Sequence, residues 1–187
     1  MKNTFFLIWV LLCTSSCKIG GSFQGLYSYY NKEYARNPEL FEKVQDTTVN
    51  ICNLQSITPK VYIINGKQLR QCIKNSDKSL IYIWSPKCKG KFCYPLNILQ
   101  TKCDNKNIDL YIVSEYYDSK LMQIDYGLKK SIYGIDTEYY KTNLTSQYTK
   151  LFFEDLDVNN LEEEKFLYYE KGLLSDKSKS IDIIERN

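Results

Sequence analysis

Residues 79–100, SLIYIWSPKCKGKFCYPLNILQ, decide the fold of this chain. They begin with an apolar run at 80–84, which is typical of a buried strand. A lysine-rich loop with Cys88 and Cys93 follows, and Pro95 then opens a segment with the apolar spacing of a helix. Because open α/β sheets carry their chemistry at the carboxyl ends of their strands, we expect both thiols at that edge of a sheet.

The segments around this stretch alternate between short apolar runs and helical patterns. The crossovers between the runs are long enough for parallel pairing of strands. The sequence therefore predicts an α/β domain with a central sheet flanked by helices. Strands are expected at 61–64, 79–84, 108–113 and 166–169, a short helix or loop at 67–75, helices at 95–103 and 119–130 and within 137–156, and a turn at Tyr133-Gly134.

Size and composition limit the possible functions. The 187 residues allow one domain with additional segments, and 43% hydrophobic and 25% charged residues indicate a globular protein. The net charge of +3, without a basic stretch that alternates with aromatic residues, argues against nucleic-acid binding. The chain contains no histidine, which excludes His-based triads and His metal sites.

Residues 1–17, MKNTFFLIWVLLCTSSC, have the features of an export signal. Lys2 precedes an apolar run at 5–13 that is too short to span a bilayer. The small residues that end at Cys17 resemble a bacterial lipoprotein signal in the relaxed form of Bacteroidetes-type lipoproteins, in which this cysteine is lipidated. This resemblance implies an extracytoplasmic, periplasm-facing protein that its acyl chains hold on a membrane. The alternative is an ordinary cleaved signal peptide.

Residues 18–57 form an extension before the domain, which we place at 58–187. A short tether covers 18–23, and the pattern at 24–46 predicts two short helices. Asn37 is expected to cap the second helix and Pro38 to take its first position. We expect this extension either to pack on the domain or to act as a spacer.

Residues 61–88, VYIINGKQLRQCIKNSDKSLIYIWSPKC, resemble the opening of thioredoxin-like proteins of the extracytoplasmic TlpA/ResA kind. In that family a short strand and an Asn/Asp-Gly turn precede a buried strand that ends in Trp. The first active-site cysteine follows that Trp by four residues, as Cys88 follows Trp84 here. Residues 108–118, IDLYIVSEYYD, resemble the next strand and loop. The resemblance implies a thioredoxin-like fold and a thiol-disulfide oxidoreductase whose partners are the thiols or disulfides of exported proteins.

The chain departs from this family at three places. Four residues separate Cys88 from Cys93 instead of two, and Lys91 stands where the second cysteine is expected. No proline follows Pro95, although the family has a cis-proline before the strand after its third helix. The segment at 137–164 is longer than is typical. The alternative function is therefore a catalytically degenerate thioredoxin-fold lipoprotein that binds a peptide or another protein of the cell envelope.

The two thiols of the loop have assigned roles in the first hypothesis: Cys88 attacks a substrate disulfide and Cys93 resolves the mixed disulfide. A nearby helix start and the lysines of the loop are expected to lower the pKa of the Cys88 thiol. Residues five apart within a helix lie roughly 140° apart around the axis, so the ring cannot close inside a helix. It can close if 88–91 is loop and the helix begins near Phe92, and Pro95 favours such a late start. A structural disulfide and two unpaired thiols remain alternatives. The expected site loop comprises Trp84, Pro86, Lys87, Lys89 and Lys91.

Three further cysteines are expected in the mature chain. Cys52 could tie the N-terminal segment to Cys72, for which a core position is equally open, and Cys103 lies on an apolar helical face. Without histidine or a Cys-x-x-Cys pair, we expect no metal site, and no motif indicates a cofactor. Glu115 and Asp118 are expected at the same sheet edge as the loop thiols, either as proton carriers or as solvated loop charges.

Overall fold

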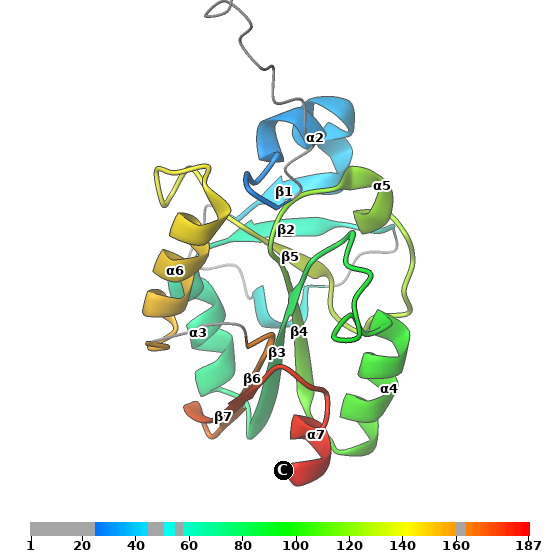
Figure 1. The fold of residues 1–187 in the computed structure, drawn as a ribbon, viewed down its shortest axis with the longest axis vertical. Coiled ribbons are helices and arrows are strands. Elements are labelled where there is room, and N and C mark those ends of the chain that lie inside the picture. The colour runs from blue at the N-terminus through cyan, green and yellow to red at the C-terminus, as the bar shows by residue number, and fades with distance from the viewer. Residues whose placement is uncertain (1–24, 45–50, 55–57, 160–163) are drawn as a thin grey trace, which may run out of the picture.

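The computed structural model describes residues 25–44, 51–54, 58–159 and 164–187. A seven-stranded mixed sheet lies between two layers of helices (Figure 1). The prediction of an α/β sheet flanked by helices is therefore confirmed. The predicted lipidation site, Cys17, lies outside the described residues together with the rest of the signal segment.

The sheet combines a parallel part with an antiparallel hairpin. Its strand order is β1-β2-β5-β4-β3-β6-β7. The first five strands in this order pair in parallel, whereas β6 is antiparallel to β3 and β7 is antiparallel to β6. The strands are β1 (Phe41–Lys43), β2 (Val61–Ile64), β3 (Lys78–Trp84), β4 (Asp109–Ser114), β5 (Ile132–Ile135), β6 (Phe166–Glu170) and β7 (Leu173–Ser178).

Helices cover both faces of this sheet. Figure 1 shows α3 and α6 on one face and α4 and α7 on the other, with α2 and α5 near the end of the molecule where β1 lies. The α-helices are α2 (Tyr30–Arg36), α3 (Gly66–Lys74), α4 (Leu96–Asn105), α5 (Ser119–Met122), α6 (Thr145–Asp155) and α7 (Ile183–Arg186), and the 3-10 helices are η1 (Pro38–Leu40) and η2 (Ile51–Asn53).

Strand β3 lies inside the sheet between β4 and β6, and both of its faces are buried. Leu80, Tyr82 and Trp84 join the core beneath α4, whereas Ile81 and Ile83 join the core beneath α3 and α6. A strand covered on both sides reads as a continuous apolar run, which is the pattern that predicted it. Packing on both faces therefore holds the carboxyl end of β3 in place, and the loop with Cys88 starts from there.

The start of α3 follows the Asn65-Gly66 pair. Asn65 caps the helix by accepting a hydrogen bond from the backbone N–H of Gln68, and the Gln68 side chain accepts one from the Asn65 N–H in return. A Cβ atom at Gly66 would collide with the carbonyl oxygen of Phe152 and would lie 2.6 Å from Cβ of Asp155. Glycine at this position therefore lets α3 approach α6 closely.

A disulfide joins Cys52 in η2 to Cys72 in α3, with the two Cα atoms 5.1 Å apart. Cys72 is buried against this face of the sheet. The hypothesis that Cys52 ties the N-terminal segment to the domain is confirmed. A bridge that closes a loop of this length stabilises a small domain by about 3 kcal/mol in the chain-entropy account.

The segment around Tyr133-Gly134 forms strand β5, so the prediction of a turn is wrong. Glycine is required there by packing: a Cβ atom at Gly134 would lie 2.5 Å from the Tyr117 hydroxyl oxygen. That hydroxyl belongs to a buried side chain and donates a 2.7 Å hydrogen bond to the Ile135 carbonyl oxygen. The Tyr-Gly pair therefore marks a close approach inside the sheet.

Two other elements differ from prediction. The helix expected over 119–130 is confined to α5, and Gly127 beyond it has φ +66, a backbone conformation that interrupts a helix. The extension contributes strand β1, which was not predicted, in addition to the two short helices α2 and η1. The helix expected within 137–156 is α6. Pro38 takes the first position of η1 as predicted, but Asn37 makes no side-chain cap.

Candidate functional site

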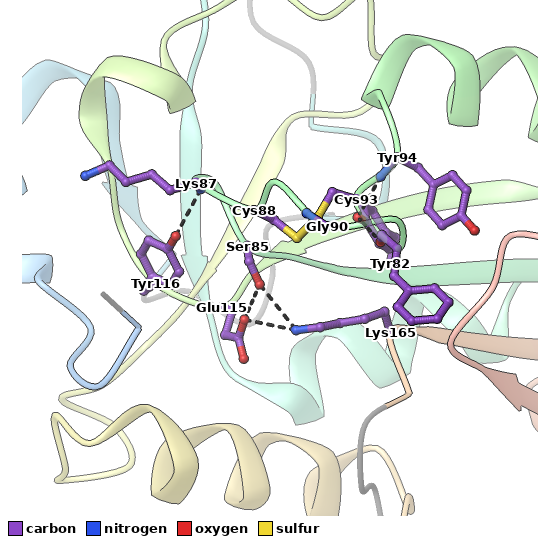
Figure 2. Close-up of a disulfide and its surroundings, with 11 residues drawn as sticks. Tyr82, Ser85, Lys87, Cys88, Gly90, Cys93, Tyr94, Glu115, Tyr116 and Lys165 are labelled. Carbon is purple, nitrogen blue, oxygen red and sulfur yellow. Dashed lines mark hydrogen bonds and ion pairs between the residues drawn. A yellow bond between two sulfur atoms is a disulfide. The ribbon is translucent and has the colours of Figure 1, made fainter. Parts of the chain in front are cut away.

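The loop between β3 and α4 carries Cys88 and Cys93, which are joined by a disulfide (Figure 2). Two turns shape the loop: the Cys88 N–H donates to the Ser85 carbonyl at 2.9 Å, and the Cys93 N–H donates to the Gly90 carbonyl at 3.1 Å. The two Cα atoms lie 5.7 Å apart, a normal separation for bridged cysteines. The disulfide therefore lies at the sheet edge where β3 and β4 end.

Two buried tyrosines hold the ends of this loop. The Lys87 N–H donates a 2.9 Å hydrogen bond to the Tyr116 hydroxyl oxygen, which comes from the loop after β4. At the other end the Tyr94 N–H donates to the Tyr82 hydroxyl oxygen at 3.3 Å. Neither tyrosine was singled out for this role from the sequence, because only the fold brings their hydroxyl groups to the loop.

The two sulfurs differ in their surroundings. Cys88 is exposed to solvent, whereas Cys93 is partly buried. The Gly90 N–H donates a 2.9 Å hydrogen bond to the Cys93 sulfur. An external thiol or disulfide therefore has its freest approach to Cys88, and Cys93 is the sulfur that the protein itself contacts.

Helix α4 begins where Pro95 predicted it. Pro95 is its N-cap and Leu96 its first residue, so the entire ring from Cys88 to Cys93 lies in the loop. The helix start lies a few residues after Phe92, and the condition that the ring must lie outside the helix is met. Cys93 is closer to the helix start than Cys88, so the positive end of the helix dipole favours Cys93 more than the expected nucleophile.

The lysines of the loop do not converge on the disulfide. Lys87 points away from it (Figure 2), and its Nζ atom forms a 2.7 Å ion pair with Asp118. This hydrogen bond raises the pKa of the Lys87 amine. The Lys91 Nζ atom lies over the Phe92 ring, 4.9 Å from its centroid. Lys89 is exposed in the same loop, so the three lysines provide positive surface around Cys88 without touching its sulfur.

Trp84 and Pro86 shape the base of the loop. Trp84 is buried and meets the Tyr126 ring edge-on, with the ring centroids 5.8 Å apart. Pro86, two residues further along the chain, is partly buried. Trp84 thus belongs to the core beneath the loop and contributes little to the surface around the disulfide.

A polar cluster that sequence reasoning missed lies beneath the disulfide loop. Lys165, which directly precedes β6, extends its Nζ atom to within 3.2 Å of the Ser85 hydroxyl and 3.0 Å of a Glu115 carboxylate oxygen. The Ser85 hydroxyl also donates to that carboxylate oxygen (Figure 2). Glu115 therefore does not stand alone as a solvated charge. The cluster could have been predicted if β6 had been recognised as antiparallel to β3. In that arrangement β6 begins at the sheet edge where β3 ends, which brings Lys165 to Ser85.

Cys103 is an unreactive core thiol, as predicted. It is fully buried in α4, and burial raises the pKa of its thiol to about 12. A thiol that holds its proton so firmly is a poor nucleophile. Among the residues that the structure describes, no group of His, Cys, Asp or Glu side chains gathers closely enough to hold a metal ion.

Comparisons with known proteins gave no match, since no family model, no curated protein and no solved structure is significantly similar to this chain. None of the helices in the described ranges combines the length and the apolar character needed to cross a bilayer.

The Asp118–Lys87 pair predicts a pH dependence of stability. Burial raises the pKa of the Asp118 carboxyl, whereas hydrogen bonds from the Lys87 amine and the Leu121 N–H lower it. The hydrogen bonds outweigh burial, so the pKa of this carboxyl lies below its usual value of 3.8. A carboxyl whose pKa falls on folding contributes stability above its unfolded pKa, and this contribution disappears as the pH falls through the folded value. We expect Asp118→Asn to lower the free energy of unfolding by about 1 kcal/mol near pH 6 and by progressively less below about pH 4.

Urea unfolding at a series of pH values measures this effect. Glu154→Gln is the matched control, because Glu154 is exposed and its oxygen lies 3.9 Å from Lys150 in a surface pair. That variant is expected to follow the wild-type pH profile. A constant difference between D118N and wild type from pH 2 to pH 6 would contradict the assigned role of the pair.

Proposed function

We propose that this protein is a thiol-disulfide oxidoreductase with a thioredoxin-like fold that acts on exported proteins. The observation that carries the proposal is an exposed Cys88, bonded to Cys93, in a loop at the carboxyl edge of the central strand. Purely structural disulfides are usually buried or close long loops, because a short ring contributes little loop entropy. This bridge has one exposed cysteine, Cys88, and closes a short ring, and reversible chemistry is the function that suits it best.

The arrangement of elements supports the thioredoxin-like part of the proposal. Strand β2, the Asn65-Gly66 turn, the buried strand β3 ending at Trp84, and Cys88 four residues later follow the order found in TlpA/ResA-type proteins. Strand β4 then pairs in parallel with β3. The chain differs in its longer spacing between the cysteines, which the loop accommodates before α4 begins.

The proposed reaction transfers two electrons between the protein and a substrate. In reduction, the Cys88 thiolate attacks a substrate disulfide, forms a mixed disulfide and releases one substrate thiolate. The Cys93 thiolate then attacks the Cys88 sulfur and releases the second substrate thiolate, which leaves the Cys88–Cys93 disulfide. Each released thiolate takes up a proton from solvent. In the opposite direction, a substrate dithiol is oxidised and the protein disulfide is reduced.

The location proposed for this activity is a membrane surface outside the cytoplasm. The support is the sequence at 1–17, in which an apolar run and small residues lead to Cys17. A lipidated N-terminal cysteine would hold the domain near the membrane through the segment at 18–24. Disulfide chemistry is typical of such oxidising compartments.

A second candidate function is a binding module that uses the same scaffold without turnover. The observation in its favour is Lys165, which stands directly before β6, where the resembling family has its proline. Its side chain occupies the space beneath the loop by pairing with Ser85 and Glu115. In this hypothesis the Cys88–Cys93 bridge holds the loop in shape for a peptide or an envelope protein.

Equilibration of the protein with defined mixtures of reduced and oxidised glutathione separates the two candidates. An oxidoreductase is expected to interconvert fully between a dithiol and a disulfide form at Cys88 and Cys93, with a potential above about −300 mV. It should also catalyse the reduction of insulin by dithiothreitol. The variant with both cysteines replaced by serine is the control. If the Cys88–Cys93 disulfide has a reduction potential below about −300 mV and the protein does not catalyse insulin reduction, the oxidoreductase proposal fails. The binding module is then the remaining candidate.

A further inference from the structure

A recess of about 240 Å³ lies beside the disulfide loop. It is framed by α2 and by the loop that follows β4. Tyr116 lines it, and the hydroxyl of this tyrosine accepts the hydrogen bond from the Lys87 N–H that anchors the loop. Lys87 also lines the recess and directly precedes Cys88. The recess therefore lies next to the exposed residue Cys88.

The recess is lined by more positive than negative groups. The four cations are Lys32, Arg36, Lys87 and Lys120, and the two carboxylates are Glu33 and Asp118.

Both carboxylates already have partners within the protein. Glu33 pairs with Arg36 at 2.9 Å, and its other oxygen accepts hydrogen bonds from the backbone and side chain of Ser119 at 3.1 and 2.6 Å. Asp118 pairs with Lys87 at 2.7 Å and accepts from the Leu121 N–H. Neither carboxylate is therefore available to neutralise the remaining cations.

Two lysines of the recess have no carboxylate partner among the described residues. Lys32 projects from α2 and Lys120 from α5, and both are exposed. The adjoining loop adds Lys89 and Lys91 and contains no acidic residue between positions 85 and 95. The recess and the adjoining loop together therefore carry an excess of positive side chains.

We propose that this recess is the docking site for an acidic segment of the substrate protein. The inference rests on the proposed oxidoreductase function and names the class of substrate: an exported polypeptide with Asp or Glu residues a few positions from its reactive sulfur. Carboxylates of such a segment would complement Lys32 and Lys120 while the sulfur meets Cys88. Complementary charge across such a surface raises the rate of encounter and disfavours partners of the wrong charge.

The extension thereby acquires a role in recognition. Helix α2 belongs to the segment that precedes the thioredoxin-like domain, yet it supplies Lys32, Glu33 and Arg36 to the recess. The hydrogen bonds between Glu33 and Ser119 fix α2 against α5. A concave site built in this way suits the side chains of a polypeptide better than the surface of a lipid bilayer.

The test uses two peptides with the same pair of disulfide-bonded cysteines, flanked by Asp and Glu in one and by Lys in the other. The reduced protein is expected to reduce the acidic peptide about tenfold faster at low ionic strength, and the preference is expected to shrink severalfold in 0.5 M salt. Lys32→Glu with Lys120→Glu should reduce the ratio of the two rates about tenfold. A ratio near one in the wild-type protein would overturn the proposal.

Two controls keep this result interpretable. Lys74→Glu with Lys106→Glu changes two exposed lysines, the last residue of α3 and the C-cap of α4, at the opposite sheet edge, and it should leave the ratio unchanged. Lys32→Gln with Lys120→Gln should give an intermediate ratio. An equal loss of preference in the 74/106 variant would overturn the assignment of the site, because net charge alone would then explain the effect.

A binding measurement separates this inference from the proposed chemistry. An acidic peptide with serine in place of both cysteines is expected to bind the protein in calorimetric titration and to lose affinity about tenfold in K32E/K120E. If this binding is seen without any disulfide exchange, the recess is supported and the oxidoreductase proposal fails. If disulfide exchange occurs but the acidic serine peptide does not bind, the docking proposal fails. It also fails if K32E/K120E binds the peptide normally and loses only its binding to vesicles of anionic lipid.

Discussion

Cys93→Ser is expected to accumulate a covalent complex with substrate proteins, whereas Cys88→Ser is expected to accumulate none. Cys88 is the exposed sulfur, so it should form the mixed disulfide, and only Cys93 is placed to resolve it. Both variants should lose turnover by at least about a thousandfold, as expected when members of a catalytic unit are removed. Non-reducing electrophoresis and mass spectrometry of the trapped species measure the asymmetry.

The control for this experiment is Cys103→Ala. The Cys103 thiol is buried and keeps its proton, so it should neither form complexes nor be needed for turnover. Trapping by C88S instead of C93S would reverse the roles of the two cysteines. Such a result would agree with the placement of Cys93 nearer the start of α4 and with its hydrogen bond from Gly90.

Tyr82→Ala is expected to lower the free energy of unfolding by about 3–5 kcal/mol, the range for loss of a large buried side chain. Tyr82 is almost fully buried, and its ring stacks on Phe166 with the centroids 4.6 Å apart. Its hydroxyl also accepts the hydrogen bond from the Tyr94 N–H that holds one end of the disulfide loop. The variant should therefore lose stability and loosen the loop together.

Tyr82→Phe separates these two effects because it keeps the stacked ring and removes only the hydroxyl. It is expected to cost about 1 kcal/mol in urea unfolding and to speed amide hydrogen exchange at Tyr94. Unchanged exchange at Tyr94 in Y82F would show that the hydroxyl does not restrain the loop. A loss below 1 kcal/mol in Y82A would contradict the central place of this ring in the core.

The part of the fold that could be predicted from the sequence is the part determined by local patterns. The apolar run at 80–84 identified β3, because burial on both faces leaves a clear local signal. The leucine and isoleucine spacing at 67–75 left α3 open as a short helix or a loop, and the role of Asn65 as its cap was not predicted. The position of Cys88 and Cys93 at the sheet edge followed directly, since the loop begins where the strand ends. Pro95 predicted the start of α4 correctly, since it is the N-cap of that helix.

The rest depended on contacts between distant residues. Strand β5 was missed because Gly134 resembles a turn residue until Tyr117 is known to lie against it. The cluster of Ser85, Glu115 and Lys165 joins residues from three separate loops, and no local spacing encodes it. The recess was likewise invisible, because it forms only where the extension packs on the loop after β4.

The two disulfides of this domain differ in their access to solvent, and this difference has a consequence for biogenesis. Reagents that reach the outer bridge at Cys88 reach the inner one less easily, because Cys72 is buried on α3 and Cys52 is only partly exposed. We therefore expect the inner bridge to be made before the nascent domain closes, by an oxidant supplied from elsewhere. Under the proposed function this bridge would be assembled once, whereas the outer bridge would be opened and closed repeatedly.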